Sequence, residues 1–483
     1  MPPIWPTPRT GNFPNPPKGP GYYSVLDELR GEWRESPPKY GYPPFALMQP
    51  GLFNADFRYL DDPNNTSHDF FDPLKRIRIG DNWLFSTGGQ AWIRNMNEGN
   101  SRLTEVNNTY TVERVRAYGD LWYQDKFRIY TEFISADITG YDLPPLPNDV
   151  NRADFLNLFM DMKLGEVDGK PVYVRVGRQE MLLGSQRLIS SLDWANTRRT
   201  FQGVSAFRQG EDWDVTAFWV RPVIPDANKL DSWDEKQNFA GLWTTYRPEK
   251  GQSVDFYYLY LDNENTVVQQ GIARAPFQAH TLGTRYSGDK YNFLWDGEVA
   301  LQLGERGKES IVAGMATAGA GYHFDQLPMN PTFWLYYDYA SGDSNPNSGN
   351  YNTFNQLFPF GHYYLGWADL VGRQNIQDLN AHLFLYPVNW MTLWFQAHHF
   401  WLAESEDALY NAAGSAYRRS PNGSAGRDVG TELDFTANFH LTKHSDLMVG
   451  YSKLFGGSFL ENTAGPNKAV DSDLLYIIYG YRW

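Results

Sequence analysis

Three groups of side chains in this sequence have residue types that could support chemistry. His398 and His399 are adjacent imidazoles, Glu432 and Asp434 are carboxylates two positions apart, and residues 176–208 contain arginines at positions 178, 187, 198, 199 and 208. Such groups serve in metal binding, in acid–base catalysis and in anion binding, respectively. The elements that carry these side chains decide which of these uses is open to the chain.

Those elements are predicted to be β-strands, because apolar side chains alternate with polar or small ones over most of the chain after residue 82. In residues 291–303 the odd positions are mostly large and apolar, whereas the even positions include Asp296 and Glu298. A period of two is typical of a strand. His398 and His399 would therefore point to opposite faces and cannot chelate one metal together. Glu432 and Asp434 share a face, but no catalytic motif spacing surrounds them.

The strands are long, and their number suggests a closed barrel. Most have about 9 to 15 residues, where a strand of a soluble protein has about 5 to 6 and a tilted membrane-spanning strand needs about 9 to 11. We expect an all-β fold, a transmembrane antiparallel β-barrel with about 18 strands, with 16 as the alternative. The segments are residues 82–97, 110–123, 125–139, 153–164, 171–179, 200–209, 211–222, 237–247, 252–261, 277–287, 289–303, 308–325, 330–341, 373–386, 388–401, 427–441, 443–456 and 471–482.

Composition agrees with such a barrel and excludes other classes. There is no apolar run long enough for a transmembrane helix, and the 16% aromatic residues suit the interfacial girdles of a barrel. The chain has no cysteine and a net charge of −14, so thiolate metal sites and nucleic-acid partners are not expected. We expect a bacterial outer-membrane location, with a leader peptide removed before residue 1.

The first 72 residues differ from the rest of the chain. Thirteen of the 30 prolines lie in the first 50 residues, and we expect at most one short helix, within residues 23–33. We divide the chain into a Pro-rich extension, residues 1–72, and a barrel, residues 73–483. The extension would act as a plug, an arm or a periplasmic segment for a partner protein of the envelope, with a disordered tail as the alternative.

Parity within the strands predicts which charges face the lumen. A charge on the lipid face costs about 2–4 kcal/mol near the midplane, so charged residues opposite the apolar positions should point inward. A barrel of this size is too wide for side chains to fill and should leave an aqueous lumen. Early strands contribute mostly arginines and late strands mostly acids, so the lining would have a transverse electric field that selects solutes by charge. The alternative is that these charges only hydrate the pore. The predicted lining residues are Arg114, Arg116, Asp120, Arg128, Glu132, Arg175, Asp296, Glu298, Glu432 and Asp434.

Several motifs resemble the alginate export family of outer-membrane porins. They are the segment GRQEMLLGSQRLISSLDWANTRRTFQGV (177–204), HHFWLAESEDALY (398–410), GRDVGTELDF (426–435) and the aromatic C-terminal strand. The resemblance implies an 18-stranded barrel whose basic constriction conducts an anionic polyuronate. It adds Arg178, Arg198 and Arg199 to the lining, although Arg178 would need a bulge at Gly177, or a place above the membrane rim, to point inward. The other motif positions are Gly177, Gln179, Trp194, Asn196, Phe201 and Gly203.

The sequence therefore predicts a passive outer-membrane channel for anionic saccharides, such as alginate-like polyuronates, or for other small polar solutes. The alternative is a structural barrel whose lumen is filled by its own N-terminus or by a partner protein. A soluble carbohydrate-active enzyme is the third hypothesis and the least favoured, since no catalytic residues are identified. We expect no cofactor and no metal, and the partners expected are outer-membrane lipid, lipopolysaccharide and the solute.

Overall fold

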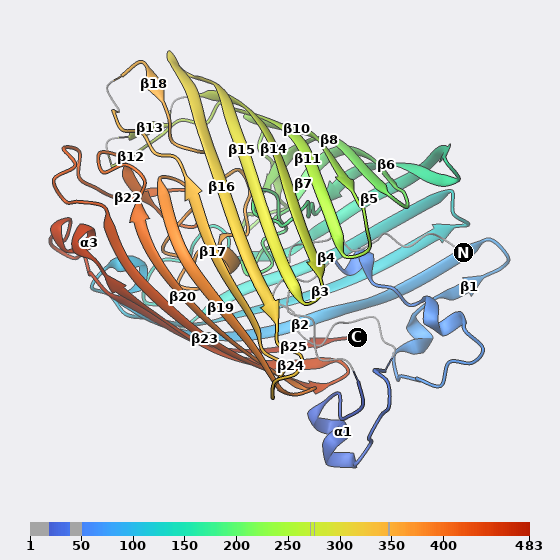
Figure 1. Ribbon diagram of the computed structural model, residues 1–483. Coiled ribbons are helices and arrows are strands. Elements are labelled where there is room, and N and C mark those ends of the chain that lie inside the picture. Colours follow the sequence, from blue (N-terminus) through green and yellow to red (C-terminus); the bar gives the residue numbers. More distant parts are fainter. Residues whose placement is uncertain (1–18, 39–50, 271, 275, 346–347) are drawn as a thin grey trace.

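The computed structural model describes residues 19–38, 51–270, 272–274, 276–345 and 348–483. Eighteen long strands form one antiparallel sheet that closes on itself (Figure 1). They are β2 (Trp83–Gly99), β3 (Asn108–Tyr123), β4 (Phe127–Thr139), β5 (Asn151–Val167), β6 (Lys170–Gln179), β7 (Phe201–Gln209), β8 (Trp213–Ile224), β10 (Gln237–Tyr246), β11 (Gln252–Asn263), β14 (Phe277–Lys290), β15 (Phe293–Arg306), β16 (Glu309–His323), β17 (Thr332–Ala340), β19 (Ile376–Val388), β20 (Met391–Leu402), β23 (Asp428–Thr442), β24 (Ser445–Gly456) and β25 (Ser472–Arg482).

The barrel closes where the last strand pairs with the first long one. β25 runs antiparallel to β2, from the pair Gln90 and Arg482 to the pair Gly99 and Asp473. Each of the other long strands pairs with the neighbours that precede and follow it in this series. The structure thus confirms the predicted antiparallel barrel and its strand number of 18.

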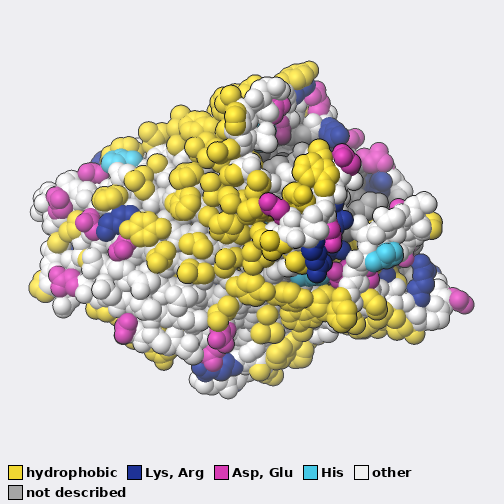
Figure 2. Space-filling view, turned by 90° about the horizontal axis from the view of Figure 1, so that it is seen from below, with side chains coloured by type: hydrophobic (Ala, Val, Ile, Leu, Met, Phe, Trp, Pro, Cys, Tyr) yellow, Lys and Arg dark blue, Asp and Glu magenta, His cyan; other side chains and the backbone are white. Residues whose placement is uncertain are grey.

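The wall has an apolar outer face and a polar inner face. In β3, Val115 is 47% exposed on the outside, whereas Arg114 and Arg116 are each 1% exposed on the inside. The outer face carries many exposed aromatic and aliphatic side chains, which gather in a broad area of the surface in Figure 2. This alternation is what a wall between hydrocarbon and a polar interior requires.

The links between strands differ at the two ends of the barrel. At one end short turns such as residues 168–169 and 443–444 join the strands, and at the other end lie long segments such as 180–200, 341–375 and 403–427. By the rule for such barrels, the short turns face the periplasm and the long segments face outward. Among the described residues no helix is long and apolar enough to cross a bilayer.

Short elements fill these links and the N-terminal segment. The short strands are β1 (Ile77–Ile79), β9 (Ser232–Trp233), β12 (Val267–Gln269), β13 (Ile272–Arg274), β18 (Asn350–Tyr351), β21 (Ala408–Tyr410) and β22 (Ala416–Arg419). The helices are α1 (Val25–Arg30), η1 (Leu52–Asn54), η2 (Arg58–Asp61), η3 (Asp72–Leu74), η4 (Ser101–Leu103), α2 (Gly361–Tyr364) and α3 (Ser458–Asn462).

The described part of the N-terminal extension lies across the periplasmic end of the barrel; residues 1–18 and 39–50 of this predicted segment lie outside the described residues. α1 is the short helix expected within residues 23–33, and Ser24 caps it by accepting a hydrogen bond from the Asp27 amide at 3.1 Å. Its Glu28 accepts a hydrogen bond of 2.5 Å from the Trp390 indole at the turn between β19 and β20. Asp69 contacts His444 at the turn between β23 and β24, with 2.7 Å between Oδ2 and Nε2. In Figure 1 this segment lies at the end of the barrel that also holds the C-terminus.

Between these anchors, residues 51–57 enter the barrel, and we call them the N-terminal turn. Leu52 and Phe53 are 6% and 8% exposed and pack against Tyr130, Phe159 and their neighbours on the inner wall. The Arg128 guanidinium donates a hydrogen bond of 2.8 Å to the Phe53 carbonyl oxygen. The periplasmic mouth is therefore partly occupied by the chain's own extension.

Candidate constriction inside the barrel

Two long extracellular links fold into the lumen and join there. They are residues 180–200, between β6 and β7, and residues 341–375, between β17 and β19. The Ser190 amide donates to the Phe358 carbonyl, and the Phe358 amide donates to the Leu188 carbonyl, each at 2.9 Å. The Tyr364 hydroxyl adds a bond of 2.6 Å to the Ser185 carbonyl. We call these two segments together the loop plate.

One side of the loop plate is attached to β15 through a single arginine. The guanidinium of Arg187 lies 2.7 Å from a carboxylate oxygen of Asp296 and 3.1 Å from one of Glu298. All three side chains are fully buried. Removing one partner of a buried ion pair strongly destabilises the packing of the segments that it joins. Arg187 is therefore a tether between the plate and the wall.

The opposite side of the plate is attached to β3 and β4. Arg114 pairs with the Asp193 carboxylate at 3.0 Å and donates to the carbonyl oxygens of Asp193 and Ala195 at 3.2 and 3.1 Å. Arg198 pairs with Asp193 and, at 2.5 Å, with Glu180. On this side the link binds Arg114 of the wall through its own acid and carbonyl groups, and Arg198 pairs with acids of the link itself.

A stack of aromatic rings closes the plate near β2 and β25. The Trp194 and His362 rings, one from each segment of the plate, lie 3.8 Å apart at 15°. Trp367 stacks on Tyr476 of β25 at 5.4 Å and 5°. The guanidinium of Arg94, on β2, lies 4.1 Å from the centre of the Trp194 ring. Aromatic and cation–π contacts of this kind fix the two segments against the wall.

The predicted lining residues of the strands all lie in the interior, in separate groups. Nine of them are at most 6% exposed: Arg114, Arg116, Arg128, Glu132, Arg175, Asp296, Glu298, Glu432 and Asp434. Asp120 is half-buried and pairs with Arg128 at 2.7 Å. Most of these side chains contact each other, the loop plate or the N-terminal turn, so the lumen is far more filled than its strand number suggests.

The groups of interior charges differ in which part of the molecule lies beside them. Arg116 binds Glu132 at 2.6 Å beside the plate, and Arg175 binds Asp161 at 2.7 Å beside the N-terminal turn. Glu432 instead accepts a hydrogen bond of 2.9 Å from the Ala368 amide of the plate. In the part of the chain that is described, no three His, Asp or Glu side chains converge as metal ligands do.

Arg178 is placed differently from the other predicted lining residues. The register of β5 and β6 has no bulge at Gly177, and Arg178 is paired with Leu158, which is 46% exposed on the outer face. Its guanidinium reaches Asp154 at 3.2 Å and the Asp231 carbonyl oxygen at 2.9 Å. These contacts attach the link between β8 and β9 to the rim of the barrel.

Arg94 and Arg199, which border the loop plate, have no carboxylate partner among the described residues. Arg94 donates to the Trp194 carbonyl at 2.9 Å, and Arg199 donates to the Pro359 carbonyl at 3.1 Å. Within the described residues, no carboxylate oxygen lies within 4.0 Å of either guanidinium. Burial lowers the pKa of Arg199 to about 10, which leaves it charged at neutral pH. The plate region therefore holds two guanidinium groups that no carboxylate pairs directly.

Sequence reasoning missed Arg94, Arg187 and Arg285 as interior residues. Arg285 binds Asp296 at 2.7 Å and has the inward parity of its strand, so the same alternation could have found it. Arg94 lies on the same face of β2 as the apolar residues Trp92 and Met96. In the sequence this face therefore resembles a lipid-facing one. Arg187 lies in a link without any period, and no local signal marks it.

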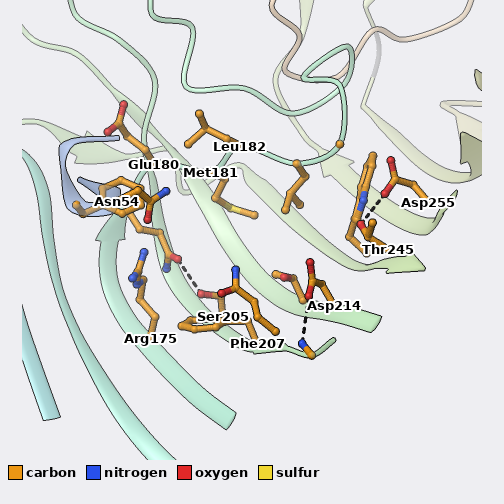
Figure 3. A pocket seen from close by; sticks show the side chains of 18 of the residues that line it. Asn54, Arg175, Glu180, Met181, Leu182, Ser205, Phe207, Asp214, Thr245 and Asp255 are labelled. Carbon is orange, nitrogen blue, oxygen red and sulfur yellow. Dashed lines mark hydrogen bonds between the residues drawn. The ribbon is translucent and has the colours of Figure 1, made fainter. Parts of the chain in front are cut away.

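Below the plate, a cavity opens toward the periplasm. It has a volume of about 380 Å³ and lies between the N-terminal turn and strands β6 to β11. Figure 3 shows Asn54 and Arg175 on one side of it and Thr245 and Asp255 on the other. Gly184 of the loop plate bounds it: its φ is +54°, and an added Cβ would lie 2.2 Å from the Trp243 ring. We call this cavity the vestibule.

Comparison of this chain with known protein families and solved structures agrees with this architecture. The family model described as "Alginate export" matches residues 84–470. The solved structure of OccD3 (OpdP) from Pseudomonas aeruginosa is 11% identical, with a TM-score of 0.52 over 82% of this chain and 91% of that one. OpdK from Pseudomonas aeruginosa is 11% identical, with a TM-score of 0.53 over 82% of this chain and 99% of that one. No curated protein matches the sequence.

Proposed function

The chain belongs to the alginate export family, and on the premise that it is an outer-membrane channel for small solutes, we propose that it passes anionic saccharides of the polyuronate type by passive diffusion. Membership of this family makes it a transport channel and not an enzyme. Smaller polar anions would follow the same route.

The observation that carries the proposal is that the guanidinium groups of Arg94 and Arg199 donate to carbonyl oxygens and have no carboxylate partner among the described residues. The other interior arginines described above face carboxylates that neutralise them, for example Arg116 with Glu132. A guanidinium without a carboxylate partner attracts carboxylates strongly where water is scarce. When the loop plate moves, these two cations are the groups that a uronate carboxylate would meet, and they favour anions over cations.

Replacing both residues, as Arg94→Gln with Arg199→Gln, is expected to reduce anion selectivity. The anion-to-cation permeability ratio, measured from the reversal potential in a salt gradient across a planar bilayer, should fall at least about twofold, because the local positive charge is lost. Block by polyuronate should weaken in parallel, whereas neutral dextran should act equally on both proteins.

Two controls separate charge from structure in this experiment. The double variant Arg94→Lys with Arg199→Lys keeps both charges and should retain the selectivity. Arg152→Gln removes an exposed cation that pairs with Asp137 at the rim, outside the lumen, and should change nothing. An unchanged permeability ratio in the double Gln variant would contradict the proposal.

A second candidate function, a barrel closed by its own extension, is favoured by the N-terminal turn. Phe53 packs on Tyr130 and Phe159 with 5.8 Å between ring centres in both cases, and the Arg175 guanidinium lies 5.2 Å from its ring. In this candidate the extension keeps the channel shut until something displaces it. Conductance of a chain without residues 1–72 distinguishes the two candidates.

We also propose that α1 contacts a protein of the periplasm. Leu29 is 80% exposed and the nearby Trp33 is 57% exposed, so this part of the extension presents two large apolar side chains to the periplasm. A photo-crosslinking residue at position 29 should form a protein adduct in whole cells, whereas one at Leu230, which is 64% exposed in the link between β8 and β9 at the extracellular end, should not. Equal labelling at both positions would remove the support for this contact.

A further inference from the structure

The lipid-facing wall has a groove that the channel function does not use. It spans β17, β19, β20, β23 and β24 and has a volume of about 770 Å³. We call it the outer groove. Its lining residues include Ala381, Ala397, Phe395, Leu433 and Tyr451.

The groove exists because two small residues face each other in a wall of large ones. Ala381 of β19 is paired with Ala397 of β20. The cross-strand pair on the same face toward the periplasm is Leu383 with Phe395, and the pair toward the outside is Leu379 with His399. Since side chains two positions apart share a face, the missing bulk at the alanines leaves a depression between aromatic and aliphatic ridges.

A lysine stands at the edge of this groove on the lipid face. Lys453 is paired with Leu433 in the register of β23 and β24, and it belongs to the groove lining. Its ammonium lies 5.9 Å from the centre of the Phe455 ring, which is nearer the extracellular end of β24. Among the described residues, including its register neighbour Asp473, no carboxylate oxygen lies within 4.0 Å of it.

An unpaired cation in this position needs a counter-charge. On a barrel's lipid face a lysine costs about 2–4 kcal/mol at the midplane and about 0–1 kcal/mol near the interface, and its stem lets the ammonium reach toward the headgroups. Lys453 lies three positions before the end of β24 at Gly456, at the end of the barrel that carries the long segments. Its ammonium is thus directed to the outer leaflet, where phosphorylated glycolipid forms the surface.

We propose that the outer groove binds the lipid A part of lipopolysaccharide, with an acyl chain over the Ala381–Ala397 pair and a phosphate at Lys453. The apolar lining fits a hydrocarbon chain, of which each buried CH₂ contributes about 0.8 kcal/mol. The lysine complements the phosphate by charge. This site is independent of the lumen, so its test does not depend on which solute the channel passes.

The test counts bound glycolipid on the purified full-length protein. Native mass spectrometry of protein incubated with lipid A should show about three- to fivefold less bound lipid for Lys453→Gln than for the original chain, as expected for one partly exposed ion pair. Lys290→Gln removes a lysine at the periplasmic end, where it pairs with Glu249, and should not change the count. Dephosphorylated lipid A should bind the original chain and Lys453→Gln equally.

A second variant tests the groove itself. Ala381→Leu with Ala397→Leu fills the depression and should lower binding of both lipid forms, while heat-modifiable gel migration shows that the barrel is folded. Equal lipid A retention by the original chain and Lys453→Gln would overturn the proposal. A dimer mass that disappears in the double Leu variant would also overturn it, because a second copy of the chain would then be the occupant.

Discussion

Removal of residues 1–72 is expected to raise the mean conductance of the reconstituted channel severalfold. The N-terminal turn lies between the inner wall and the loop plate, where Leu52 and Phe53 pack against Tyr130 and Leu182. Without it, the vestibule of about 380 Å³ joins the space that the turn occupied. Ion flow through a pore rises with its cross-section, so the shortened chain should conduct more at every voltage. Single-channel recording in a planar bilayer measures this effect.

Point variants make this experiment specific to the turn. Phe53→Ala removes the ring that Arg175 and Phe159 contact and should reproduce part of the increase. Leu29→Ala, in α1 outside the lumen, is the matched control and should leave conductance unchanged. Equal conductance with and without residues 1–72 would contradict the role of the turn. No current from either protein would contradict the channel and leave the structural barrel.

Arg187→Met is expected to release the loop plate from β15 and to make the channel open more often. The guanidinium is shared by Asp296 and Glu298, and losing one partner of a buried ion pair typically costs about 3–5 kcal/mol. A change of that size moves an equilibrium between docked and undocked loops by more than about a hundredfold. Recordings should show longer and larger openings, and trypsin should cleave the segment 180–200 faster.

Two further variants serve as controls for Arg187→Met. Arg152→Met breaks an exposed pair with Asp137 and should have little effect, because such pairs contribute less than about 1 kcal/mol. Adding Glu298→Gln to Arg187→Met should partly restore the barrel's stability, since Glu298 then carries no uncompensated charge, whereas Asp296 keeps Arg285 as its partner at 2.7 Å. Identical opening frequencies in the original chain and Arg187→Met would show that the plate is held by other contacts.

The buried pairs also change how selectivity should be tested. Reversing the charge of Arg114 and Arg116 would place carboxylates against Asp193 and Glu132, at 3.0 and 2.6 Å in the present pairs. Such a variant would report the stability of the barrel rather than the preference of the pore. Arg94 and Arg199 are better positions, because their removal leaves no buried carboxylate without a partner.

Much of the barrel could be predicted from residue alternation. The segment 110–123 corresponds to β3 (Asn108–Tyr123), and 471–482 corresponds to β25 (Ser472–Arg482). The largest shift occurs where 289–303 was expected and β15 begins at Phe293, because β14 continues to Lys290 and the turn falls on Tyr291 and Asn292, both with positive φ. Alternation cannot locate a turn of two residues whose types also fit a strand.

The alternation of apolar and polar residues determined the barrel, its strand number and its two faces. Lipid on one side and a polar interior on the other impose a period of two on every strand. Only the tertiary structure decided what fills the interior. Arg187 meets Asp296 across 109 positions of sequence, and Phe53 meets Arg128 across 75. Loops and extensions carry no period, and their contacts depend on which segments the closed barrel brings together. Many of the lumen charges on the strands were therefore predictable one by one, whereas Arg94, Arg187 of the link and the partners of these charges were not.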